Sequence, residues 1–284
     1  MNWLSSLLTP FDYTFFVNGC IVATVAGALC GTTGVYITLR GMSYIGHGLS
    51  HAIFGGFVAA SIIQFNYYLG AGVWGIASAM MITRVARSRG IGSDAAIGVI
   101  TTASFALGVA LLTVFGSRGP SFDAALFGSI VGVRPIDVWV VVGVTALTVV
   151  IVIVRYRALL FTTFDPEVAQ ASGLSVARMD LLLMTVLALA ILSTLTIIGV
   201  TLVAATLVVP AVIARMIAPT FAHMVPLAAG IGAVAGFFGM NLSYHADVPS
   251  GTMIVLVGAA LFAVAYLFTS NRHRTRRAAG ALAR

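Results

Sequence analysis

Charged residues interrupt an otherwise apolar chain at long intervals, and these intervals set the elements that we expect. They separate seven charge-free runs: 13–39, 41–83, 95–117, 138–154, 181–214, 216–246 and 248–271. A helix that crosses the hydrocarbon core of a bilayer needs about 20 predominantly apolar residues. Five runs therefore hold one span each, and the two longest can hold two. The pattern predicts an all-α fold, a polytopic transmembrane helix bundle of eight or nine spanning helices.

The run 181–214 leaves the number of spans open. As one helix it would be about 51 Å long, which exceeds the hydrocarbon core of roughly 30 Å. We expect it to break, at Gly199 and Pro210. A helix broken at membrane depth must turn its freed backbone groups toward protein or a water-filled cavity, which makes this stretch a candidate wall of a transport pathway. A plain proline kink is the simpler alternative.

Composition agrees with a membrane protein and excludes an ordinary soluble one. Of the 284 residues, 60% are hydrophobic and 8% are charged, whereas soluble domains have about 25% charged residues. The formal net charge of +7 comes from arginines that flank the apolar runs, as in the positive-inside rule, and not from a nucleic-acid-binding surface. Arginines at 84–89, 155–178 and 272–277, with Arg40 and Arg215, predict nine crossings and an outside N-terminus.

The sequence contains no lysine, and this limits its chemistry. A Walker A loop and Schiff-base catalysis both require a lysine amine, so energy from ATP must come from another subunit. The eight acidic residues all lie at span edges or in loops, which does not support a proton relay through membrane carboxylates. We interpret residues 1–284 as one transmembrane domain that ends in a basic cytoplasmic tail at 271–284.

Small residues at four-residue spacing predict close helix packing inside the bundle. Gly27 and Gly31, and the pair Gly232/Gly236, have this spacing. Cys20 and Cys30 are about 15 Å apart along one predicted helix, too far for a disulfide. We interpret both cysteines as packing residues.

The polar interval 155–180, RYRALLFTTFDPEVAQASGLSVARMD, predicts a short helix outside the membrane. Asp165 suits the N-cap, Pro166 the first helical position and Glu167 the positive helix end. Gly173 suits a left-handed stop. We therefore expect a capped cytoplasmic helix at 165–173 that inserts into a groove of a partner protein. A merely ordered loop is the alternative.

Two segments are expected at the outer surface. Residues 117–135 contain a Gly-Pro turn and then an apolar stretch too short to span, which predicts a partial helix. In YHADVPSG, His245 and Asp247 form a possible outer entry that would guide a cation. Two solvated loop residues are the simpler interpretation of this pair.

His47 and His51 lie in the second predicted span, four positions apart, so both imidazoles share one helical face. This is the spacing of a metal chelate, but two nitrogen ligands make only half of a site. A second copy of the chain, with this face at its axis, would bring four imidazoles together. Hydrogen bonding across a helix interface is the alternative without a metal.

The sequence HGLSH also has the spacing of the H-E-x-x-H zinc-protease motif. Gly48 stands where that motif has its general base. An intramembrane zinc metalloenzyme that uses His47 and His51 is the competing function, and a simple channel is the third.

Six blocks follow one another along the chain: LRGMSYIGHGLSHAIFGG (39–56), GIGSDAAIGVI (90–100), DAALFGSIVGV (123–133), FDPEVAQASGL (164–174), IGVTLVAATLVVPAVIAR (198–215) and DVPSGTMIVL (247–256). Together they resemble the membrane permease subunits of bacterial metal-ion ABC importers, the ABC-3 type, which carry manganese, zinc or iron. The resemblance covers nearly the whole chain.

The resemblance implies a non-enzymatic importer subunit of the bacterial plasma membrane, paired with a second permease copy or a close relative. It implies two cytoplasmic ATP-binding subunits and an extracellular or periplasmic metal-binding protein as partners. It also implies that 165–173 is the coupling helix, and that a divalent metal ion passes His47 and His51, with no tightly bound cofactor. In the family an aspartate usually stands where this chain has His47. Exchange of a carboxylate for an imidazole favours zinc or iron over manganese.

Overall fold

The computed structural model describes residues 9–86, 92–115, 126–129 and 133–282. Within these ranges the regular structure is helical. The helices, in chain order, are η1 (Thr9–Asp12), α2 (Thr14–Leu39), α3 (Ser43–Ile62), α4 (Tyr67–Ala86), α5 (Ser93–Phe115), α7 (Pro135–Val154), α8 (Tyr156–Phe164), α9 (Pro166–Ala171), α10 (Val176–Ile198), α11 (Val203–Ile217), α12 (Phe221–Ala246) and α13 (Ser250–Leu282).

Eight of the described helices are long and apolar enough to cross a membrane, and α11 is a shorter apolar helix of 15 residues. By length and composition, the described helices thus comprise eight candidate spans and one shorter apolar helix. With the arginine-rich ends inside, α11 leads from the break after α10 back to the inner side at Arg215.

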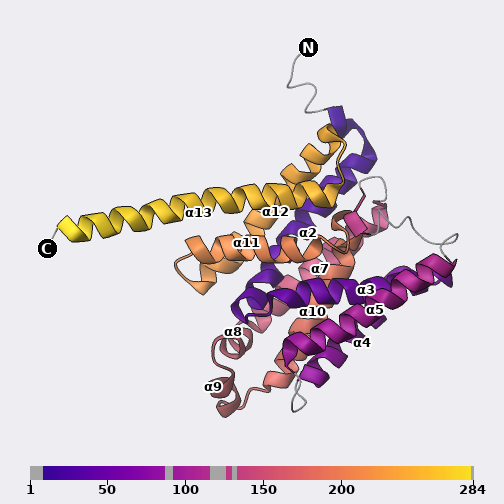
Figure 1. Cartoon of the computed structure of the whole chain (residues 1–284), viewed down its shortest axis with the longest axis horizontal. Coiled ribbons are helices and arrows are strands. Elements are labelled where there is room, and N and C mark those ends of the chain that lie inside the picture. The colour runs from indigo at the N-terminus through magenta and orange to yellow at the C-terminus, as the bar shows by residue number, and fades with distance from the viewer. Residues whose placement is uncertain (1–8, 87–91, 116–125, 130–132, 283–284) are drawn as a thin grey trace.

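The bundle has two parts that share α2 and α10. Helices α3, α4 and α5 pack against one another on one side, and α11, α12 and α13 form the other (Figure 1). α2 packs against α12, α11, α10 and α7, and most of its length is buried. The core of the molecule is therefore built around the first spanning helix.

Backbone-to-backbone contact joins α2 to α12. A Cβ atom on Gly27 would overlap the Gly232 carbonyl, one on Gly232 would overlap the Gly27 carbonyl, and one on Gly236 would overlap the Ala23 carbonyl. We call this contact the glycine seam; its members are Ala23, Gly27, Gly31, Ala228, Gly232 and Gly236. The predicted small-residue packing is confirmed, and both sides of it come from the same chain. Cys20 and Cys30 are buried and free.

The predicted break in 181–214 occurs at one of its two expected positions. α10 ends at Gly199, whose φ of +81° places it in the left-handed region. The expectation of a break at Pro210 is wrong, because Pro210 lies inside α11. Neighbouring protein groups can satisfy the backbone that a proline frees in a membrane helix, so the helix continues.

Protein groups also satisfy the carbonyls that the Gly199 break releases. The Ser250 hydroxyl donates to the Ile197 carbonyl at 2.6 Å, and the Ser129 amide donates to the Thr196 carbonyl at 3.2 Å. Such pairing is what permits irregular backbone at membrane depth.

A buried carboxylate lies near the outer ends of α4 and α7. Asp137 is fully buried in the first turn of α7, where it accepts from the Arg134 amide at 2.7 Å and from the hydroxyls of Tyr67 and Tyr68. Its position at a span edge fits the predicted placement of acidic residues. The carboxylate ties α4 to α7.

Some expected features lie outside the described residues. They include Arg87 and Arg89 and most of the predicted partial helix at 117–135, of which 126–129 and 133–135 are described. The backbone of the basic tail continues α13 as far as Leu282.

Candidate functional site

The two membrane histidines lie on one face of α3, as their spacing predicts. The ring centroids of His47 and His51 are 4.3 Å apart, and the His51 ring contacts Phe105 of α5 at 4.5 Å. His47 is exposed and His51 is half-buried, while most of the rest of α3 is buried in the bundle. Tyr44, one turn before His47, is 77% exposed. We call Tyr44, His47 and His51 the histidine face.

A local hydrogen bond orients the His51 ring. Nδ1 of His51 is 2.9 Å from the His47 carbonyl oxygen. Because a carbonyl can only accept, Nδ1 must carry the hydrogen, and in the neutral ring Nε2 then holds the free lone pair. A backbone carbonyl commonly holds a metal-binding imidazole in this way. His51 therefore presents one nitrogen as a ligand.

The histidine face alone does not form a complete metal site within the described part of one chain. Among the described residues, no group of three or more His, Cys, Asp or Glu side chains lies close enough to hold a metal ion. His47 and His51 are therefore two imidazoles without a further ligand from this set, on an exposed face of a spanning helix. Exposure to lipid is costly for ionisable side chains. The histidine face is suited to a second protein surface that carries further ligands.

Ser50 connects the histidine helix to the break after α10, a role that no sequence pattern indicates. Its buried hydroxyl is 2.8 Å from the His47 carbonyl and 2.8 Å from the Val200 carbonyl. The break therefore lies directly behind the histidine face. A serine in a helix-packing position is too common to be singled out from sequence.

The structure forms the predicted capped helix as α9. The Asp165 carboxylate accepts from the Val168 amide at 2.9 Å, and Pro166 is the first helical residue. Gly173 ends the segment with a φ of +83°. α8 and α9 stand out from the bundle at the lower left of Figure 1, and Glu167 is exposed beside Val168 and Phe164. This mixed surface fits a protein partner.

His245 and Asp247 lie at the opposite end of the molecule from α9 along the chain's predicted topology. His245 occupies the last turn of α12 and Asp247 is its C-cap, and both are exposed. The His245 Nδ1 is 2.9 Å from the Asn241 carbonyl. Both residues are thus accessible at one helix end.

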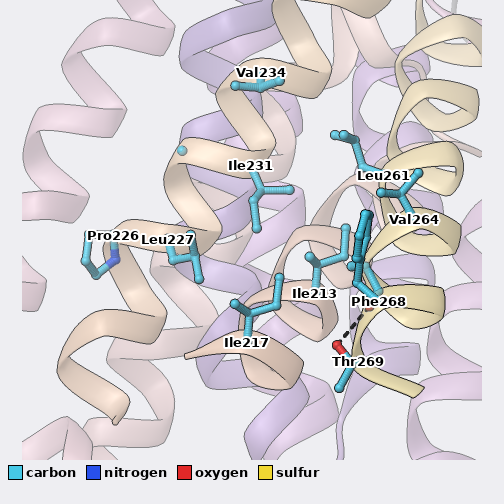
Figure 2. Close-up of a pocket in the computed structure, with 12 residues that line it drawn as sticks. Ile213, Ile217, Pro226, Leu227, Ile231, Val234, Leu261, Val264, Phe268 and Thr269 are labelled. Atoms are coloured by element: carbon cyan, nitrogen blue, oxygen red, sulfur yellow. Dashed lines mark hydrogen bonds between the residues drawn. The ribbon is translucent and has the colours of Figure 1, made fainter. Parts of the chain in front are cut away.

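An apolar groove of about 890 Å³ lies between α11, α12 and α13 (Figure 2), and its lining includes no residue of the histidine face. The side chains of Ile213, Ile231 and Phe268 are among those that line it, and Thr269 is its one polar side chain. The Thr269 hydroxyl donates to the Ala265 carbonyl. Such a lining offers no ligand to a metal ion and suits lipid chains.

The fold and these features define a class: a polytopic helical membrane protein with two neighbouring imidazoles on one span and a short helix that projects from one end. The ABC 3 transport family matches residues 12–269. The chain belongs to this family. It is accordingly a permease subunit of a metal-ion ABC importer, a multi-pass protein of the bacterial plasma membrane, and not an enzyme.

Two curated relatives illustrate the range of the family. The manganese transport system membrane protein MntC of Halalkalibacterium halodurans is 37% identical over 95% of this chain and 94% of its own length. The chelated iron transport system membrane protein YfeC of Yersinia pestis is 31% identical over 96% of this chain and 95% of its own length. Relatives of similar identity are thus named for different metals.

Two solved structures have the same fold. PsaBC from Streptococcus pneumoniae, in complex with Fab, matches with a TM-score of 0.84 and 32% identity over 93% of this chain and 95% of the matched chain. A putative metal-chelate type ABC transporter in an inward-facing conformation matches with a TM-score of 0.69 and 16% identity, over 88% and 85% of the two chains. The second likeness concerns the fold alone.

Proposed function

We propose that this permease carries a divalent transition-metal ion along the histidine face, with His47 and His51 as ligands from each of two copies. The single observation that carries the proposal is the pair of imidazoles, one exposed and one half-buried, with ring centroids 4.3 Å apart on a helix that is otherwise largely buried. A two-fold axis beside this face would place four imidazole nitrogens around one ion.

The ligand set favours zinc and iron over manganese. Imidazole suits Zn²⁺ and Fe²⁺ well, whereas carboxylate oxygen suits Mn²⁺. His47 stands at the position where the family usually has a carboxylate, so the site has nitrogen donors in place of a hard anionic oxygen. The relatives named for manganese and for chelated iron are consistent with cargo that changes within the family.

The energy for transport comes from ATP-binding subunits that dock on α9. Asp165 and Pro166 fix the start of this helix, Glu167 presents a charge on its exposed surface, and Gly173 ends it. Closure of the two ATP-binding subunits then moves the permease between outward-open and inward-open states. A separate metal-binding protein delivers the ion at the outer surface, where His245 and Asp247 guide its entry.

The test of this proposal is metal uptake into vesicles that contain the permease, its ATP-binding subunit and its binding protein. We expect ATP-dependent uptake by the wild type and background uptake by the His47→Ala/His51→Ala double variant, with equal amounts of assembled complex. His223→Ala is the matched control, because His223 lies in the first turn of α12, where it bonds Thr220 at 2.8 Å. Undiminished uptake by the double variant would overturn the assignment of the site.

A further inference from the structure

Arg40, at the end of α2, makes three side-chain hydrogen bonds in a nearly buried position. Its Nη1 lies 2.6 Å from the Asp180 carboxylate of α10, its Nη2 donates to the Thr162 hydroxyl at 3.0 Å, and its Nε donates to the Thr163 hydroxyl at 3.2 Å. The Arg40 side chain is 8% exposed. One guanidinium therefore holds the inner ends of α2, α8 and α10 together.

The two threonines connect Arg40 directly to the projecting helix. Thr162 and Thr163 lie in the last turn of α8, and Asp165 both ends α8 and caps α9. No flexible linker separates the two helices. A displacement of α9 by a bound partner is therefore transmitted to the two hydroxyls that Arg40 holds.

On its other side Arg40 is joined by a short turn to the histidine helix. Gly41 has a φ of +69°, the Met42 amide donates to the Ile37 carbonyl at 3.0 Å, and α3 begins at Ser43. His47 is one turn further along α3. Only the turn at Gly41 and Met42 and the first turn of α3 therefore separate Arg40 from His47.

A cavity beside this network gives the parts room to move. Its volume is about 270 Å³, and its lining includes Arg40 and Asp180, Met42 and Ile45 from the start of the histidine helix, and Pro166 of α9. Because this cavity borders both α9 and the start of α3, one helix can shift against the other here without overlapping packed side chains.

We propose that Arg40 is a positioning residue that transmits movement of α9 to the histidine helix, through Thr162 and Thr163 on one side and the turn at Gly41 on the other. The inference rests on the proposed function, because it takes α9 as the docking helix and α3 as the metal-bearing helix. A buried ion pair contributes little net stability compared with apolar packing. Its directional bonds fix the relative positions of the three helices.

The decisive variant removes the link to α8 and leaves the ion pair intact. Thr162→Val/Thr163→Val keeps the shape of both side chains and deletes the two hydroxyl acceptors of Arg40, while the Asp180 carboxylate remains. In vesicles with the complete transporter, we expect ATP hydrolysis to continue while the metal transported per ATP hydrolysed falls about fivefold or more, the scale of coupling between distant sites. The measurement is radiometal uptake and phosphate release from the same vesicles.

Two matched variants separate transmission from simple structural support. Thr162→Ser/Thr163→Ser restores both hydroxyls and is expected to transport as much metal per ATP as the wild type. Thr185→Val, on α10, removes a hydroxyl that donates to the Leu181 carbonyl of its own helix, and it is expected to leave the ratio unchanged.

Three results would overturn the inference. A valine double variant with the wild-type ratio of metal to ATP would show that the link transmits nothing. Parallel loss of assembled complex, ATP hydrolysis and transport would assign the threonines to folding alone. Failure of the wild-type complex to transport any metal would remove the proposed function, and this inference with it.

Discussion

The glycine seam and the histidine face are both helix surfaces of the same bundle, but the seam is closely packed and the histidine face is largely exposed. At the seam, α2 and α12 approach until a Cβ atom on Gly27 or Gly232 would overlap the opposite carbonyl. On α3, His47 and Tyr44 are exposed, with no comparable cover within this chain's described residues. The seam has no room for an added methyl group, whereas the histidine face has room for a second protein surface. Stability and transport should therefore respond to different substitutions.

The largest effect is expected at the seam. Gly232→Ala adds a Cβ that overlaps the Gly27 carbonyl, so α2 and α12 must separate. We expect a loss of about 3 kcal/mol in the free energy of unfolding, at the upper end of the cost of overpacking. Chemical unfolding of the purified protein in detergent would measure it.

Gly230→Ala is the matched control on the same helix. Its added Cβ would meet open space, and alanine is a better helix former than glycine by up to about 1 kcal/mol. We expect this variant to be as stable as the wild type or more stable. Equal destabilisation by both substitutions would show that close approach at the seam is not the cause.

A smaller effect is expected on the histidine face, where function and not stability should change. His47→Asp replaces an exposed imidazole with a carboxylate oxygen donor, which favours manganese. We expect the ratio of manganese to zinc uptake to rise about tenfold, which corresponds to about 1.4 kcal/mol. Competition uptake in vesicles would measure the ratio, and His223→Asp, in the first turn of α12, provides a comparison away from the face. An unchanged ratio would mean that position 47 does not select the metal.

The smallest effect is expected at Ser50, which links the histidine helix to the break. Ser50→Ala removes the hydroxyl that lies 2.8 Å from the Val200 carbonyl, at a cost of about 1 kcal/mol in unfolding free energy. Ser193→Ala is its control, since that buried hydroxyl donates within its own helix to the Ala190 carbonyl. A greater loss in the Ser193 variant would contradict the role given to Ser50.

Features that depend on spacing along one helix could be predicted from sequence. The spans, the shared face of His47 and His51 and the cap at Asp165 all follow from helical periodicity and local capping chemistry. The structure has each of them where the residues indicate. What the histidine face and α9 bind stays a prediction.

Features that depend on which helices become neighbours could not be predicted in the same way. Arg40 was assigned only to the positive-inside pattern, yet it bonds Asp180, 140 residues away. Ser50 meets Val200 across 150 residues. Nothing local distinguishes these side chains from others of their type. The predicted break at Pro210 is wrong, because a proline in a membrane helix need not end the helix.

The shortness of α11 has a consequence for how the protein is made. At 15 residues it is about 22 Å long, less than the roughly 30 Å of the hydrocarbon core. A helix of this length would insert poorly into the bilayer by itself. Its buried contacts with α2 and α12 must already be forming when it settles. We therefore expect α11 to enter the membrane against helices that are already there, in contrast to α12 and α13, which are long enough to span on their own.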